Sequence, residues 1–112
     1  MYFKEKVIVW IHGSVRTPPF SAEARKKTGL LLRVLQLGGL ISMPFSRPLP
    51  MIGRNCHELR INDGNVTWRI IYRIDTEVIL VVDVFKKKTE TLPTSVIKTC
   101  IASFRWYDLQ ED

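Results

Sequence analysis

The 112-residue sequence predicts an α+β domain in which a small, curved, mostly antiparallel β-sheet carries helices packed on one face. Three strand-like segments follow one another between residues 57 and 86, separated by short turns. One amphipathic helical segment precedes these strands and another follows them. The length is typical of one domain, so we expect residues 1–112 to form a single folding unit.

The first half of the chain predicts one strand and one helix, each followed by a connector. Residues 6–12 are rich in β-branched and aromatic side chains, which favour a strand. Residues 13–20 contain two prolines and are therefore expected to form a connector. Ser21 is a good helix N-cap, and the helix that it opens is expected to end at residues 38–39, which are both glycine. Residues 40–55 hold three prolines without periodicity, which predicts a long irregular connector.

The second half predicts three consecutive strands and a final helix. Strands are expected at 57–62, 66–75 and 77–86, and a tight Asp-Gly-Asn turn joins the first two. The third strand is almost continuously apolar, which is typical of a central strand covered on both faces. Residues 94–109 follow a proline and show an apolar stripe at helical spacing, so they predict the last helix.

The composition is basic, with 17 Lys and Arg against 11 Asp and Glu, a net charge of +6. Such a surplus favours an anionic partner, most often nucleic acid, although a merely basic, solubilising surface gives the same number. The two cysteines, Cys56 and Cys100, do not form a disulfide framework and fit a reducing compartment. No apolar run is long enough for a membrane span, so we expect a cytoplasmic protein.

The hairpin at 57–74 separates two kinds of side chain onto two faces. Because successive strand residues point to opposite faces, one register turns five apolar side chains toward the helix: Leu59, Ile61, Trp68, Ile70 and Tyr72. Arg60 and Arg69 then lie together on the other face. Two neighbouring guanidinium groups repel each other unless an anion lies between them. Glu58 is one candidate for that anion and a bound phosphate is another, so either an ion pair or a phosphate site fits.

A second basic feature follows the last strand, where Lys86, Lys87 and Lys88 are consecutive. These lysines suit a phosphate-backbone contact, but lysines also protect strand ends from further pairing. The pair Cys56 and His57 does not predict a catalytic dyad, since adjacent strand residues point to opposite faces. The histidines and cysteines lack the spacing of metal ligands, so we expect no metal site and no cofactor.

Four motifs, in this order and spacing, resemble those of phage-derived HigB-type toxins of the RelE/ParE superfamily. They are "MPFSRPLP" at 43–50, "CHELRIND" at 56–63, "TWRIIYRID" at 67–75 and "VFKKKTETLP" at 84–93. The resemblance extends over roughly residues 6–107 and implies a RelE-like toxin fold. It also implies the toxin of a type II toxin–antitoxin pair, usually a ribosome-dependent, metal-independent endoribonuclease that cleaves mRNA.

The resemblance also assigns roles to the basic residues. Arg69 occupies the phosphate-clamping position, with Arg60 and Lys87 as further cationic groups of the catalytic site. The resemblance does not assign the base for the ribose 2′-hydroxyl; from the residues, the candidates are Glu58 and a lysine whose pKa neighbouring positive charges lower. Further phosphate contacts are expected from four residues: Lys86, Lys88, Arg73 and Arg47.

The expected partners follow from the same resemblance. They are mRNA on the ribosome and a helix-turn-helix antitoxin of the HigA type, which forms a heteromer with the toxin. A different class of function stays open, namely a gyrase inhibitor of the ParE type or a basic phage accessory protein that binds nucleic acid without cleaving it.

Overall fold

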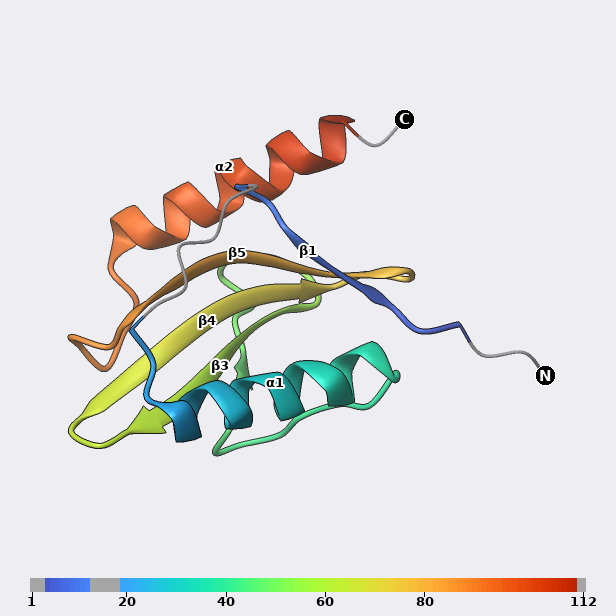
Figure 1. The fold of residues 1–112 in the computed structure, drawn as a ribbon. Coiled ribbons are helices and arrows are strands. Elements are labelled where there is room, and N and C mark those ends of the chain that lie inside the picture. The colour runs from blue at the N-terminus through green and yellow to red at the C-terminus, as the bar shows by residue number, and fades with distance from the viewer. Residues whose placement is uncertain (1–3, 13–18, 111–112) are drawn as a thin grey trace.

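The computed structural model describes residues 4–12 and 19–110 and shows a curved five-stranded sheet with two long helices (Figure 1). The strands occur in the order β1-β5-β4-β3-β2 across the sheet. In chain order the elements are β1 (Val7–Trp10), α1 (Ala22–Gln36), β2 (Ser46–Pro48), β3 (Cys56–Asp63), β4 (Val66–Ile74), β5 (Val78–Lys86) and α2 (Thr94–Gln110). The α+β class is confirmed, and the arrangement is compatible with a RelE-like fold.

Helix α1 begins and ends close to the predicted residues because local signals define both ends. The Ser21 side chain accepts a hydrogen bond from the backbone N–H of Ala24 at 3.1 Å, and so caps the first turn. At the other end Gly38 has a positive φ of 86°, a conformation that glycine adopts without strain. The buried residues Ala24, Thr28, Leu32 and Leu35 recur every three or four positions, so one stripe of the helix faces the sheet.

The hairpin of β3 and β4 has the predicted register. Arg60 lies directly opposite Arg69, and Leu59 lies opposite Ile70. The turn between the strands contains Gly64 at φ +60°, which explains the need for glycine there. Next along the sheet, β4 pairs with β5, and a bulge interrupts their register between Ile71 and Tyr72.

The two helices lie on opposite faces of the sheet, which differs from the prediction that both pack on one face (Figure 1). Helix α1 covers the face that carries the five predicted apolar side chains of the hairpin. Helix α2 covers the other face, where Cys100 and Phe104 pack against Ile71, Leu80 and Val82. The arginine-bearing face is therefore not a free surface. Its strands also carry apolar residues, and these require a helix to keep them from water.

Two strands differ in detail from the sequence-based expectation. The connector 40–55 contains the short edge strand β2, whose Ser46 hydroxyl hydrogen-bonds the Tyr72 hydroxyl at 2.7 Å. Strand β1 pairs in parallel with β5, whereas β3, β4 and β5 are consecutive antiparallel neighbours.

The expected connector at 13–20 lies mostly outside the described residues. Within the described part of the chain, no helix is both long and apolar enough to cross a bilayer.

Arg73 fastens α2 to the sheet. Its guanidinium donates to Asp75 at 2.8 Å and 2.9 Å, and to Asp108 of α2 at 2.6 Å and 3.1 Å. The same group lies 5.0 Å from the centre of the Phe104 ring. These hydrogen bonds, first those to Asp75, raise the pKa of Arg73, so the contact stays charged.

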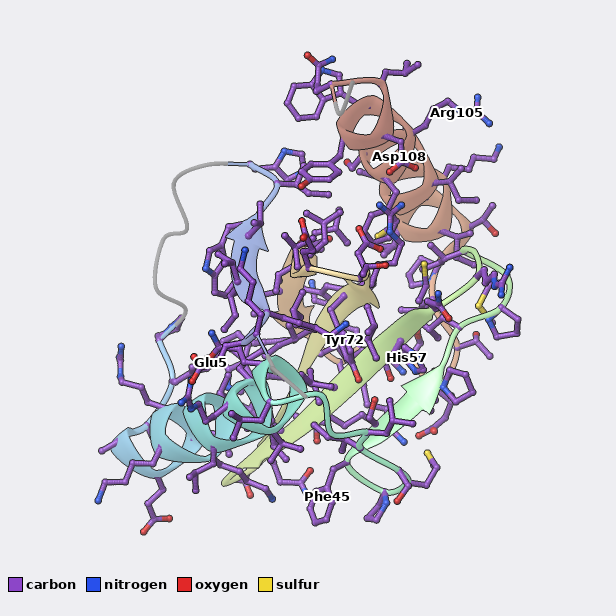
Figure 2. All side chains as sticks on the ribbon, turned by 90° about the vertical axis from the view of Figure 1, so that its right-hand side faces the viewer. Glu5, Phe45, His57, Tyr72, Arg105 and Asp108 are labelled. Carbon is purple, nitrogen blue, oxygen red and sulfur yellow. The ribbon has the colours of Figure 1, made fainter. Side chains whose placement is uncertain are left out.

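Replacing Arg73 by alanine should loosen α2 from the sheet. We expect Arg73→Ala to lower the free energy of unfolding by about 2 kcal/mol, because charged hydrogen bonds are lost. Urea unfolding measures the change, and Arg105→Ala is the matched control. Arg105 is exposed on the same helix as Asp108 (Figure 2), so its removal should leave the unfolding midpoint within experimental error. Equal midpoints for the two variants would contradict this role of Arg73.

Candidate nucleic-acid site

Three arginines surround one carboxylate on the face of the sheet that α2 covers. Glu58 lies in β3, and its carboxylate oxygens are 3.2 Å from Arg47 Nε, 3.6 Å from Arg60 Nε and 3.2 Å from Arg69 Nε. Strand pairing sets this arrangement, because Arg47 is opposite Glu58 and Arg60 is opposite Arg69. We call these four residues the arginine cluster. A carboxylate therefore occupies the position between the guanidinium groups that the sequence left open to a carboxylate or a phosphate.

The cluster has an inner and an outer part. The side chain of Glu58 is 0% exposed and that of Arg69 is 1% exposed. Arg47 and Arg60 keep 29% and 20% of their side chains in contact with solvent. Burial lowers the pKa of Arg69, although a guanidinium stays protonated at any working pH. Glu58 and Arg69 thus form the base of the cluster, and Arg47 and Arg60 form its accessible edge.

The inner atoms of the cluster meet as ion pairs, at N···O distances of 3.2 Å for Arg47 and Arg69. Among the described side chains, both carboxylate oxygens of Glu58 and the Nε atoms of Arg47 and Arg69 are buried without a hydrogen-bond partner. Three positive charges face one negative charge, so the cluster has a positive surplus. That surplus, held on three adjacent strands, can attract an anion to the accessible edge.

The loop after β5 brings a further cation to the cluster. The carbonyl oxygen of Glu90 accepts from Arg69 at 2.9 Å and from Arg47 at 3.4 Å. Lys87 Nζ pairs with the Glu90 carboxylate at 3.0 Å, and the backbone N–H of Lys87 donates to Thr67. Lys87, with 21% of its side chain exposed, is therefore the predicted lysine that the loop places beside the arginines.

The other predicted phosphate contacts are spread out. Lys88 is exposed on the same loop and lines a cavity that Arg69 also borders. Lys86 also borders this cavity, but its ammonium lies 5.6 Å from the centre of the Trp68 ring, which packs toward α1. Arg73 shares the face of Arg69 but binds Asp75 and Asp108 instead. Arg73 therefore lies apart from the arginine cluster, whereas Lys86 and Lys88 both border the cavity beside it.

The alternatives that the sequence disfavoured are also separated in space. Cys56 packs in the core beneath α2, whereas the His57 ring stacks on Tyr72 with centroids 5.4 Å apart (Figure 2). Both cysteines are free, and burial raises the pKa of the Cys56 thiol to about 11. No group of three His, Cys, Asp or Glu side chains in the described residues is arranged to hold a metal ion.

One residue beside the cluster was not singled out from the sequence. Asp83 lies half-buried in the cavity that Arg69 and Lys88 line. Its signal in the sequence was a lone carboxylate within the apolar run "VILVVDVF". Period-two alternation alone does not show where it points, because a bulge precedes it in β5.

Removing the negative charge of the cluster should be strongly destabilising. Glu58→Gln keeps the shape of the side chain but removes the buried negative charge between three guanidinium groups, so we expect a loss of about 3 kcal/mol in unfolding free energy. Thermal and urea unfolding measure this loss. The double variant Glu58→Gln/Arg69→Gln should recover part of it, because one buried positive charge is removed as well.

The matched control for this variant is Glu5→Gln, which breaks an ion pair with Arg33 at the surface. Both side chains of that pair are about half exposed, so its loss should cost less than about 1 kcal/mol. A Glu58→Gln protein as stable as the Glu5→Gln protein would show that the buried charge does not hold the cluster together.

Comparison with known proteins identifies the family of the chain. A family model described as "Phage derived protein Gp49-like (DUF891)" matches residues 19–105, which include the whole arginine cluster and most of α2. No curated protein sequence matches the chain. The expected origin in a phage-derived toxin family is thereby confirmed at the level of the family. The chain belongs to the Gp49-like family of phage-derived proteins, a family of RelE-type toxins of toxin–antitoxin pairs.

Proposed function

We propose that this toxin is an endoribonuclease that cleaves mRNA on the ribosome, and that it acts in the cytoplasm. The observation that carries the proposal is the arginine cluster, in which three guanidinium groups share a single buried carboxylate. A phosphodiester is anionic, and negative charge builds up on its oxygens as cleavage proceeds. Cations fixed before the substrate arrives stabilise that charge without having to reorganise.

The exposed and the buried residues of the cluster have different proposed roles. Arg60 and Arg47 have exposed edges, and together with Lys87 they contact the phosphate and stabilise the transition state. Arg69 lies beneath them and is completely covered, so in this conformation it positions its neighbours and adds to the local field. The Glu90 carbonyl oxygen accepts from the Arg69 guanidinium at 2.9 Å, so the direct phosphate clamp predicted for Arg69 requires a phosphate to replace this contact.

The proposed reaction is transesterification within the RNA. The ribose 2′-hydroxyl attacks the adjacent phosphorus, the bond from phosphorus to the 5′-oxygen breaks, and a 2′,3′-cyclic phosphate forms. Glu58 is an unsuitable base for the hydroxyl, since its carboxylate is fully buried beneath three guanidinium groups. We therefore assign proton transfer to a lysine instead of Glu58: the Lys87 ammonium, which pairs with the Glu90 carboxylate at 3.0 Å, donates a proton to the leaving 5′-oxygen, and the proton of the 2′-hydroxyl passes to solvent water.

Loss of the accessible cations should reduce cleavage without unfolding the protein. We expect Arg60→Ala and Lys87→Ala each to lower the rate of mRNA cleavage by about 100-fold, as removal of a single charge-stabilising group does. Primer extension on a translated mRNA measures the rate. The control variant is Arg105→Ala, which removes an exposed arginine of α2 far along the chain from the cluster.

Three outcomes would count against this proposal. Intact mRNA with the wild-type protein excludes an endoribonuclease, and double-strand DNA breaks in its place indicate the gyrase-directed alternative. RNA binding without any cleavage indicates the accessory-protein alternative. Equal cleavage by Arg60→Ala, Lys87→Ala and Arg105→Ala removes the arginine cluster from the site.

A helix-turn-helix antitoxin of the HigA type is the proposed partner, and an apolar stripe on α1 supports a protein partner. Leu30, Val34 and Leu37 recur at helical spacing on the side away from the sheet, and Leu30 is 68% exposed. The exposed basic side chain of Lys26 flanks this stripe, whereas Arg33 beside it is already paired with Glu5. An amphipathic segment with acidic edges would cover the leucines and neutralise the flanking charge.

Charged substitutions in the stripe should weaken antitoxin binding and spare catalysis. We expect Leu30→Asp/Leu37→Asp to weaken binding of the small protein encoded beside the toxin gene by at least about tenfold, as loss of buried apolar anchors does. Calorimetry measures the affinity. Leu109→Asp is the control, since Leu109 is equally exposed, at 70%, but lies on α2. Unchanged affinity in the double variant would exclude α1 as the docking surface.

A further inference from the structure

A cavity of about 430 Å³ lies beside the arginine cluster, between the end of β5 and the start of α2. Arg69 borders both the cavity and the cluster. Phe85 lies opposite Arg69 in the register of β4 and β5, and Pro93 and Val96 line the side toward α2. The volume falls in the range of pockets that bind small organic groups.

Asp83 supplies a hydrogen-bond acceptor to this cavity. The carboxylate is half-buried, and its Oδ1 accepts from the backbone N–H of Val84 at 2.9 Å. That contact uses one of about four acceptor positions of a carboxylate, so the group can still accept N–H donors from a ligand. Burial raises the pKa of Asp83 above its ordinary value, and the hydrogen bond from Val84 and the nearby His12 offset this only in part.

The position of Asp83 depends on the bulge in β5. Tyr72 is opposite Val81, and Ile71 is opposite Asp83, so Val82 is the extra residue of the bulge. Without the bulge, Asp83 would share the face of Val81, which is the apolar face beneath α1. The bulge moves the carboxylate to the face of Arg69, as bulges beside functional sites often do.

The cavity is lined by apolar side chains, one carboxylate and the lysines Lys86 and Lys88, which together match the base and the phosphate of a nucleotide. Phe85, Pro93 and Val96 offer apolar surface to the faces of a base, and Lys88 is exposed where a phosphate would lie. A carboxylate selects among bases by the donors that they present. Guanine carries two adjacent donors, N1–H and the 2-amino group, whereas adenine, cytosine and uracil each place an acceptor beside their donor.

We propose that this cavity binds a guanine of the RNA substrate, with the Asp83 carboxylate accepting hydrogen bonds from guanine N1–H and the 2-amino group. The inference rests on the proposed function, since the cavity adjoins the cations that would hold the scissile phosphate. It assigns to Asp83 a role in specificity and not in bond cleavage. The toxin would then prefer to cut beside guanine.

Binding of free nucleotides tests the cavity independently of cleavage. Guanosine monophosphate and uridine monophosphate are titrated into the full chain, and backbone amide shifts report both the affinity and the residues affected. We expect the guanine nucleotide to bind about tenfold more tightly and to shift amides of residues 83–96, as a bidentate base contact does. Asp83→Asn should remove this preference and leave uridine monophosphate binding unchanged.

Two further variants keep the test decisive. Glu23→Gln makes the same chemical change on α1, across the sheet from the cavity, and should bind both nucleotides like the wild type. Val96→Phe should fill the cavity and weaken binding of the guanine nucleotide even if Asp83→Asn fails to fold. Equal affinities for the two nucleotides, or binding that neither variant affects, would overturn the inference.

Cleavage mapping separates this inference from the proposed function. A wild-type protein that cuts RNA without regard to guanine, and whose Asp83→Asn variant cuts the same sites, retains the endoribonuclease but refutes the guanine site. A protein that binds guanosine monophosphate through Asp83 but cuts no RNA retains the guanine site and refutes the endoribonuclease.

Discussion

The burial of one carboxylate, that of Glu58, is the constraint on which the arrangement of this sheet face depends. A charged group at 0% exposure is tolerated only where opposite charges surround it. Glu58 therefore draws Arg47 from β2 and Arg69 from β4 toward its own strand, β3. The carbonyl oxygen of Glu90 then satisfies N–H groups that the arginines turn away from the carboxylate. One carboxylate thus fixes three strands and the loop after β5.

Burial of Glu58 fixes the positions of the surrounding arginines more than it stabilises the fold. A buried ion pair is often no more stabilising than apolar residues of the same volume, because removing charges from water is costly. Its effect here is to hold Arg60 beside Arg69 in a position that two like charges would not take by themselves. The free-energy cost of placing these like charges together is met during folding, before any ligand binds. Such preorganised charges are what stabilise a phosphoryl transition state.

The sequence predicted which face of the sheet each strand residue occupies, because side chains alternate along a strand. It could not predict which residues from distant parts of the chain contact that face. Alternation placed Arg60 and Arg69 together and separated Cys56 from His57. It could not place α2, because the charged residues suggested a solvent-facing side, although Ile71 on the same face required a cover. By pattern alone Arg73 resembles Arg69. Only the fold brings Asp108 to Arg73, 35 residues along the chain.

The bulge in β5 shows why alternation along the sequence does not predict the position of Asp83 beside the candidate site. Each residue of β5 after Val82 points to the opposite face from the one it would take in a strand without the bulge. Asp83 therefore lines the cavity beside Arg69 and does not lie on the apolar face beneath α1. The same shift brings Phe85 to the position opposite Arg69. An unbroken strand would bury the Asp83 carboxylate against α1 without a counter-charge and would remove the aromatic wall. The bulge therefore keeps the Asp83 carboxylate out of the apolar core beneath α1 and places both Asp83 and Phe85 in the lining of the cavity.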